Sequence, residues 1–256
     1  MTIKHDGLSV TWLGYATVRI ETADGFVAYL DPGRYGVLDD YHARDGVPGS
    51  DATGGSSPLG DGDLVCVTHN HHYDTDGIAS VAKDDATVVV FEGVDASDID
   101  RDVQAVDDLP YEIVRVGEED HLTVGDVGQV DLWSLPAYND PDGPHVDSEG
   151  NPHHPRGLGC AFLLSIGGKT VFWPGDSDAL PGFRELEVSL FLANIGGDVV
   201  MDRHEAADLA EALDPDLVLP IHYDTFELLE ADGEAFAADV ASRGVPVVLD
   251  EQSANQ

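Results

Sequence analysis

The chain consists largely of short runs of β-branched and aromatic residues, and several of these runs end beside a histidine or an aspartate. Runs of this kind, separated by Gly, Asp and Ser, predict strands. The side chains at their ends are His69 and His71 after LVCVT, Asp176 after TVFWPG, and His222 after LVLPI. Strand ends in layered α/β folds open onto one edge, where sites collect. Because imidazole with carboxylate suits zinc, manganese or iron, the pattern predicts a metal site.

The order of the runs predicts sheets sandwiched between helices, an α/β fold with mixed sheets. Strands are expected at 8–14, 16–22, 25–32, 63–69, 86–93, 111–116, 121–127, 129–138, 159–166, 170–176, 188–194, 216–224 and 245–250. Helices are expected at 75–83, at 203–213, where apolar residues recur at helical spacing, and at 234–244, which Gly244 would end. Two polar segments, 33–62 and 139–158, are expected to form long loops, and such loops are often functional.

The charge of the chain is extreme, with 50 acidic residues against 12 basic ones and a formal net charge of −38. The acids are spread along the chain and form no tail, while the apolar strands exclude a disordered acidic protein. We therefore expect a folded protein with a solvated acidic surface, adapted to a salt-loaded cytoplasm. The alternative is an acidic face that docks a basic partner. A polyanionic surface also disfavours binding to nucleic acid.

The length of 256 residues suggests one large domain or two tightly packed halves. The sequence has no apolar run of membrane-spanning length and no charged-then-apolar leader, so we expect a soluble, cytoplasmic protein with no membrane partner. Its two cysteines, Cys66 and Cys160, each lie in an apolar run. They are expected to be buried, reduced core thiols.

Motifs along nearly the whole chain resemble one family. They are TWLGYATVRIE, YLDP, VTHNHHYD, PAYN with HHPRG, WPGDSD, and the long closing stretch IGGDVVMDRHEAADLAEALDPDLVLPIHYDTF. Together they resemble the metallo-β-lactamase fold hydrolases, most closely the branch that contains ascorbate-6-phosphate lactonases.

This resemblance implies a single domain over 1–256, folded as a four-layer αββα sandwich with one or two divalent ions, zinc or manganese, at its rim. It implies that His69 and His71 bind the first ion, that Asp176 bridges both ions, and that His222 binds the second. The implied activity is hydrolysis of an ester, lactone or phosphoester bond in a small molecule. A metal-bound water or hydroxide would be the nucleophile, because divalent ions lower the pKa of water towards about 7.

The family's HxHxDH motif is irregular here, because His71 is followed by His72, Tyr73, Asp74 and Thr75. An alignment without a gap and one with an inserted residue both put Asp74 at the second metal position. We therefore expect Asp74 to bind metal and to take part in catalysis. His72 is either displaced, a substitute ligand or a solvent-facing residue.

The third histidine of the first site is also displaced. Many members place it directly after the strand, where this chain has Asn139. Three histidines follow in the loop, and His154, with Pro155 behind it, best fits the AYN…HP pattern of the resembling branch. His145 lies in mid-loop, and His153 points elsewhere if the backbone is extended.

Two further residues belong to these motifs. Tyr15 stands where family members often have histidine, and is expected at the rim. Asp31, in LDP, is expected to anchor a loop or to support a ligand.

Two other functions remain open at this point. The irregular loop is compatible with a metal-binding but catalytically silent protein that acts as a sensor or scaffold. A nuclease of the same fold is disfavoured by the acidic surface. The sequence leaves the natural substrate and the oligomeric state open.

We expect the stability of this protein to rise with potassium or sodium chloride into the molar range. Molar salt shortens the Debye length to roughly 3 Å and so relieves repulsion among the surplus carboxylates. Thermal unfolding midpoints measured from low to molar salt test this. A midpoint that is flat or falls would contradict the halophilic interpretation.

Overall fold

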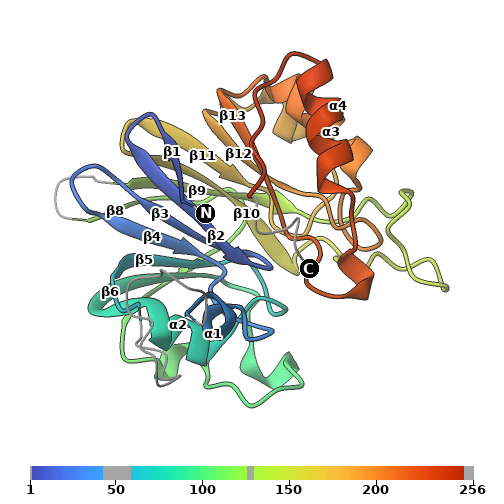
Figure 1. The fold of residues 1–256 in the computed structure, drawn as a ribbon. Helices are drawn as coiled ribbons and strands as arrows, with labels where there is room; N and C mark the ends of the chain where they lie inside the picture. Colours follow the sequence, from blue (N-terminus) through green and yellow to red (C-terminus); the bar gives the residue numbers. More distant parts are fainter. Residues whose placement is uncertain (1, 43–58, 126–129, 251–256) are drawn as a thin grey trace. The chain divides into compact units, whose positions relative to one another are not determined.

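The computed structural model describes residues 2–42, 59–125 and 130–250 (Figure 1). Its contacts divide the chain into two compact units, one over Thr2–Val116 and one from Gly117 onward. We call them the N-terminal unit and the C-terminal unit and describe each by itself. That residues 1–256 make a single domain remains a prediction.

The N-terminal unit is built on a seven-stranded sheet in which the strands follow chain order. The strands are β1 (Thr2–His5), β2 (Leu8–Gly14), β3 (Thr17–Glu21), β4 (Val27–Leu30), β5 (Gly62–Val67), β6 (Ala82–Phe91) and β7 (Glu112–Val116). Strands β1 to β4 pair antiparallel, and β4 to β7 pair parallel. The carboxyl ends of β4 and β5 therefore share one edge, where Asp31 and His69 follow.

Short helices complete this unit. They are α1 (Val37–His42), α2 (Thr75–Val81) and the 3₁₀ helices η1 (Ala96–Asp98) and η2 (Val106–Asp108). The expected helix at 75–83 is thus confirmed, two residues shorter. The expected loop 33–62 contains α1, and its residues 43–58 lie outside the described ones.

The C-terminal unit has a six-stranded sheet in the order β13-β12-β11-β10-β9-β8. Its strands are β8 (His121–Val124), β9 (Val130–Ala137), β10 (Gly159–Ile166), β11 (Lys169–Trp173), β12 (Leu190–Asn194) and β13 (Leu217–Ile221). Strands β11, β12 and β13 are parallel, and β9 runs in the same direction because both it and β11 pair antiparallel with β10. Asn139, Asp176 and His222 therefore follow strands that end at the same edge.

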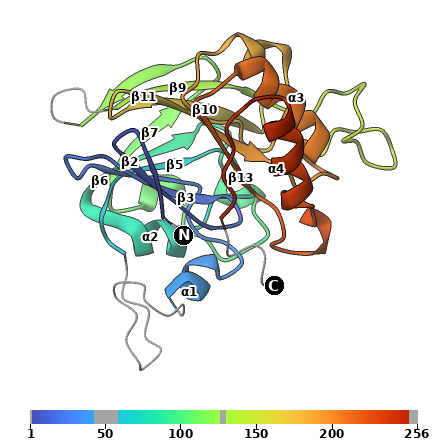
Figure 2. The ribbon, with the colours of Figure 1, turned by 45° about the horizontal axis from the view of Figure 1, so that its top comes forward.

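Helices α3 (Arg203–Leu213) and α4 (Gly233–Ser242) lie side by side in this unit (Figures 1 and 2). The remaining 3₁₀ helices are η3 (Pro181–Glu185) and η4 (Glu227–Leu229). Gly244, at φ 87°, follows α4 as the sequence predicts, because glycine adopts the left-handed conformation without a Cβ clash.

The α/β class with two mixed sheets is confirmed, and one expected strand is wrong. Residues 245–250 form only an isolated bridge, between Val218 and Val247. Pro246 has no N–H to extend the pairing, although its carbonyl accepts from Val218 N at 2.9 Å. The sequence also missed β1.

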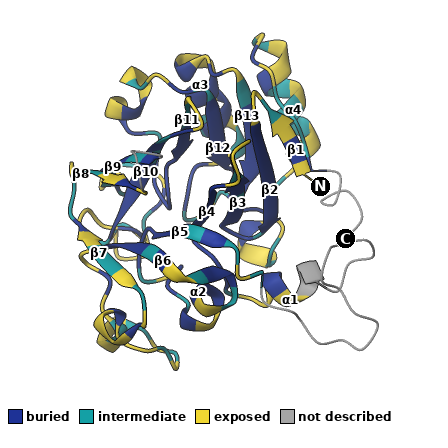
Figure 3. Ribbon diagram, turned by 90° about the vertical axis from the view of Figure 1, so that its left-hand side faces the viewer, coloured by how far each residue is buried: buried dark blue, intermediate teal, exposed yellow. Residues whose placement is uncertain are grey.

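The strands supply the core of each unit, and Figure 3 shows their buried residues against the exposed loops. Cys66 and Cys160 are buried free thiols, as expected. Burial raises the pKa of the Cys66 thiol. Among the described residues, no helix has both the length and the apolar character needed to cross a membrane.

A close backbone contact joins the turn after β4 to the first turn of α2. A Cβ at Gly77 would collide with the carbonyl oxygen of Pro32 and lie 2.7 Å from Gly33 Cα. At the same junction Arg34 N donates to Asp74 Oδ2 at 2.7 Å. Only glycine at position 77 lets the two backbones approach so closely.

We therefore expect Gly77→Ala to destabilise the protein by about 1 to 3 kcal/mol, because the backbone on both sides must shift. Denaturant unfolding measures the change. Gly182→Ala is the matched control, since a Cβ there meets nothing within 4 Å. Equal stability of the two variants would contradict the packing described here.

Candidate metal centre

Three histidines crowd the loop after β5 in the N-terminal unit. The backbone turns sharply there, because His72 N and Tyr73 N both donate to His69 O at 3.1 Å. The ring centroid of His69 is consequently 4.9 Å from that of His71 and 4.3 Å from that of His72. His69 and His72 are buried, while His71 is exposed. One ligand atom of His69 and one of His71 lie within 4.8 Å of each other. We call His69, His71 and His72 the histidine loop.

A buried carboxylate, Asp31, holds the histidine loop in place. Thr68 donates to it twice, through N to Oδ1 at 2.8 Å and through Oγ1 to Oδ2 at 2.9 Å. His72 Nδ1 also lies 2.9 Å from Oδ2. Burial alone would raise the pKa of Asp31, but His72 and Thr68 outweigh it and lower the pKa. Asp31 therefore anchors the loop, as the sequence predicts.

These contacts fix the orientation of the His69 and His72 rings. His72 meets Asp31 through Nδ1, and His69 Nδ1 lies 2.9 Å from Thr68 Oγ1. Metal-binding histidines commonly have one ring nitrogen held by an oxygen in this way. Nε2 is then the nitrogen with which each ring would coordinate an ion. The solvent-facing alternative for His72 is excluded, since it is 1% exposed.

Asp74 has a structural role at the start of α2. It is the N-cap of α2, and its Oδ1 accepts from Asp76 N at 3.1 Å and Gly77 N at 3.0 Å. Its Oδ2 accepts from Arg34 N at 2.7 Å. Both oxygens thus serve backbone N–H groups, which accounts for an aspartate here without a metal. The metal-binding and catalytic role expected of Asp74 remains a prediction beside this capping role.

The C-terminal unit brings together the other three expected ligands. Asp176 follows β11, His222 follows β13, and His154 comes from the loop between β9 and β10. His154 Nε2 lies 3.3 Å from Asp176 Oδ2, and His222 Nε2 lies 3.3 Å from Asp176 Oδ1. All three side chains are buried. His222 has a φ of 59°, a left-handed conformation that is strained for a non-glycine residue and typical of functional sites.

The spacing around Asp176 fits the edges of a metal coordination shell. Imidazole nitrogens and carboxylate oxygens bind zinc at about 2.0 to 2.2 Å, so adjacent ligand atoms in a tetrahedral shell lie roughly 3.3 Å apart. Charge-assisted hydrogen bonds between nitrogen and oxygen are shorter, at about 2.7 to 2.9 Å. Each oxygen of Asp176 faces a different histidine, as a bridging carboxylate would. These residues therefore fit a divalent ion.

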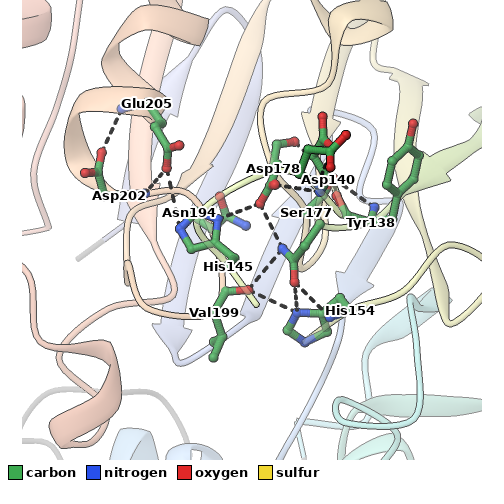
Figure 4. Close-up of polar contacts among 12 residues, drawn as sticks. Tyr138, Asp140, His145, His154, Ser177, Asp178, Asn194, Val199, Asp202 and Glu205 are labelled. Carbon is green, nitrogen blue, oxygen red and sulfur yellow. Dashed lines mark hydrogen bonds and ion pairs between the residues drawn. The ribbon is translucent and has the colours of Figure 1, made fainter. Parts of the chain in front are cut away.

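Asn139 positions the displaced histidine. Its Oδ1 accepts from the backbone N of His154 at 2.7 Å, and its Nδ2 donates to Asp178 Oδ1 at 2.9 Å and to Val199 O at 3.2 Å. The same Val199 carbonyl lies 3.0 Å from His154 Nδ1 (Figure 4). His154 Nε2 is then the ring nitrogen that faces Asp176. Asn139 thus supports His154 from the place where many members carry the ligand itself.

Asp178 anchors the rest of the loop between β9 and β10. It accepts from Asp140 N at 2.7 Å, and its Oδ1 lies 2.7 Å from His145 Nδ1. His145 Nε2 in turn lies 3.6 Å from Glu205, which belongs to the capping box of α3 (Figure 4). Burial alone would lower the pKa of His145, but Asp178 and Glu205 raise it.

The three loop histidines therefore differ in their surroundings. His145 is a buried partner of Asp178, His153 is exposed, and His154 is buried against Asp176. The sequence placed His154 correctly near Asp176 but missed the support from Asp178. Coordination of metal by His69, His71, His154, Asp176 and His222 remains a prediction.

We expect Asn139→Asp to weaken metal binding and to destabilise the protein by roughly 2 kcal/mol. A carboxylate oxygen would replace the amide donor facing Asp178 and Val199, which removes two hydrogen bonds and adds repulsion. Metal titration and denaturant unfolding measure the two effects. Asn151→Asp is the control, since Asn151 also donates to an aspartate, Asp147, but on the exposed part of the loop. If both variants keep wild-type metal affinity, Asn139 does not position His154.

Comparison with known proteins identifies the family. Residues 9–222 match the family model for the beta-lactamase superfamily domain. A UPF0173 metal-dependent hydrolase of Thermus thermophilus is 28% identical over 188 residues, 72% of this chain and 75% of that protein. Another of the same name from Natranaerobius thermophilus is 32% identical over 91 residues, 34% of this chain and 41% of that protein. A third, from Carboxydothermus hydrogenoformans, is 32% identical over 127 residues, 47% of this chain and 53% of that protein. This chain thus spans about half the length of the relatives from Natranaerobius and Carboxydothermus.

Solved structures agree with this assignment at the level of the fold. A protein of Parabacteroides distasonis superposes with a TM-score of 0.68 at 18% identity, over 98% of this chain and 97% of that one. A metallo hydrolase of Ignicoccus hospitalis superposes with a TM-score of 0.64 at 19% identity, over 95% and 94%. The chain therefore belongs to the beta-lactamase superfamily, and its fold is that of the superfamily's metallo hydrolases.

Proposed function

We propose that this protein is a metal-dependent hydrolase that cleaves an ester, lactone or phosphoester bond in a small molecule. One observation carries the proposal, namely the placement of His154 and His222 at 3.3 Å from the two oxygens of Asp176. Membership of the superfamily and the names of the relatives, which are metal-dependent hydrolases, support it. The ion would be zinc or manganese, which imidazole and carboxylate both suit.

The proposed ligands come from both units. His69 and His71 on the histidine loop, with His154 and Asp176, would hold one ion, and Asp176 with His222 would hold a second. Because Asp74 caps α2, we assign its expected place at the second ion to His72, whose ring is already held through Nδ1 by Asp31. A divalent ion bound there supplies the chemistry that these residues lack, since it lowers the pKa of water towards about 7 and polarises the bond to be cut.

The chain's own residues fix the ligands before any ion arrives. Asp31 and Thr68 orient the histidine loop, and Asn139 with Val199 orients His154. Prior orientation reduces the cost of ordering flexible side chains around the ion. Buried surroundings also strengthen the electrostatic effect of a bound ion on substrate, because the local dielectric constant is low.

A second function has one observation in its favour. Asp74 is the residue that the alignments place at the second metal position, and it is engaged by the helix that it caps. A protein without that carboxylate at the ion would bind metal without hydrolysing substrate and would act as a sensor or scaffold. Hydrolysis of generic substrates by the metal-loaded protein separates the two functions.

Other parts of the proposal follow from the composition. A formal charge of −38 favours small-molecule substrates over nucleic acid, because phosphate backbones are repelled. The same charge supports a salt-rich cytoplasm as the place of action. We also propose that the family match over residues 9–222 reflects one hydrolase domain.

We expect the purified protein to bind zinc or manganese and to hydrolyse a generic phosphodiester or lactone in high salt. His154→Ala should lose metal and reduce hydrolysis at least tenfold, because it removes a buried imidazole that faces Asp176. His153→Ala, the exposed neighbour, is the matched control and should keep both. Metal analysis and initial rates give the answer. A wild-type protein that stays metal-free after reconstitution would refute the proposal, and metal binding without hydrolysis would favour the silent alternative.

A further inference from the structure

Two of the few cations of this chain lie on the histidine loop. The guanidinium of Arg34 donates through its NH1 nitrogen to His71 O. That of Arg101 donates through its NH2 nitrogen to Asn70 O at 3.0 Å and to Tyr73 O at 2.9 Å. Both side chains are half-buried. Two arginines from different segments thus converge on backbone carbonyls of residues 70–73, the stretch that contains His71 and His72.

The hydrogen-bond acceptors of these two arginines are uncharged. Six other basic residues form ion pairs with carboxylates, namely Arg19, Lys83, Arg115, Arg156, Lys169 and Arg243. Within the described residues, neither Arg34 nor Arg101 has a carboxylate at ion-pair distance, although the chain has 50 acids for 12 bases. Their side chains donate to neutral carbonyls, so the two positive charges are not neutralised by direct pairs.

The two charges also act on each other. Burial lowers the pKa of Arg101, the nearby Arg34 charge lowers it further, and the Asp74 carboxylate offsets part of this effect. Like charges held close together and partly buried are costly unless an anion joins them. Each guanidinium has five N–H donors in a planar fork, and the carbonyl contacts use only part of them. Donors therefore remain for a carboxylate or phosphate, the groups whose geometry the fork matches.

An aromatic surface adjoins the Arg34 charge. The Arg34 guanidinium carbon lies 4.4 Å from the ring centroid of Tyr35, which is 50% exposed. Tyr35 packs edge-on against Tyr15 at 4.9 Å, and Tyr15 packs edge-on against His72 at 5.0 Å. A line of rings therefore runs from the histidine loop to an exposed tyrosine beside a cation.

We propose that the substrate carries an oxyanion, a carboxylate or a phosphate, which Arg34 and Arg101 bind beside the histidine loop while Tyr35 contacts its apolar part. This inference rests on the proposed hydrolase function and narrows it to anionic small molecules. The remaining surface is dominated by carboxylates, which repel anions. The inference therefore gives the two arginines a role as local attractive charges for an anionic group.

The competing explanation is that the two arginines only tie down the loop through its carbonyls. The two explanations differ in what is lost with the positive charge. If the arginines only anchor the loop, their removal loosens the loop and releases metal. If they bind an anion, their removal weakens anionic ligands while metal and neutral ligands stay.

The test is calorimetric titration of the metal-loaded protein with phenyl phosphate, benzoate and neutral benzyl alcohol at one fixed chloride concentration. Arg34→Gln and Arg101→Gln are compared with Arg115→Gln, which is the matched control. Arg115 lies in the same unit and also donates to two backbone carbonyls, at 3.3 and 3.1 Å, but those belong to Glu92 and Val94 and not to residues 70–73. Bound metal and the thermal midpoint are measured for every variant.

We expect one or both anions to bind the wild type at least tenfold more tightly than benzyl alcohol does. Binding should weaken tenfold or more in Arg34→Gln and Arg101→Gln and stay unchanged in Arg115→Gln, with metal content equal throughout. Whichever of phenyl phosphate and benzoate binds more tightly identifies the group. Anion binding that is absent, that survives both substitutions, or that disappears only together with the metal would overturn the inference. The titration measures binding and not turnover. A protein that binds anions through these arginines but hydrolyses no substrate in the separate rate assay would therefore contradict the hydrolase proposal and leave anion binding standing.

Discussion

Buried carboxylates that hold histidines are the interaction on which the proposed ligands of each unit depend. Asp31 fixes Thr68 and His72 in the N-terminal unit, and Asp178 fixes Asn139 and His145 in the C-terminal unit. Each of these carboxylates lies just past the carboxyl end of a strand, where the sheet gives it a rigid backbone. Such groups are costly to bury unless every oxygen is satisfied, so their removal would disturb the histidines before it disturbed the sheets.

Charge explains a second feature of the molecule. The surplus of 38 negative charges makes every buried or half-buried cation conspicuous. Six of the 12 basic residues pair with nearby acids, whereas Arg34 and Arg101 face backbone carbonyls of residues 70–73. A locally positive patch on an acidic protein would attract an anion only at short range, since salt screens longer-range forces. Under halophilic conditions recognition would therefore depend on direct contacts more than on long-range steering.

The sequence predicted most of the fold because hydrophobic periodicity is local. The strands from Leu8 onward and the three longer helices come from apolar runs with Gly and Asp breaks between them. It failed at 245–250, where the apolar pattern favours a strand but Pro246 leaves only one bridge. His154 is buried and His153 is exposed, but the two lie in a bend, so alternation along an extended segment is not the reason for the difference.

The supporting contacts of the site were much harder to predict. Aspartate before Thr-Asp-Gly is a familiar helix N-cap, yet alignment to the family motif pointed to a metal role for Asp74 instead. His72 gains its importance from Asp31, which lies 41 residues earlier, and Arg101 meets the histidine loop from about 30 residues later. Contacts between such distant segments leave no local pattern in the sequence, so only the folded structure brings them into view.

The central claim is that these histidines and Asp176 hold divalent metal. The most direct measurement is anomalous diffraction from crystals of the zinc- or manganese-loaded protein, recorded at the absorption edge of the metal. The account predicts anomalous peaks within bonding distance of His69, His71, His154, Asp176 and His222, with His72 coordinating and Asp74 still capping α2. Peaks that lie elsewhere, or a fully loaded crystal with no metal on Asp176, would contradict it.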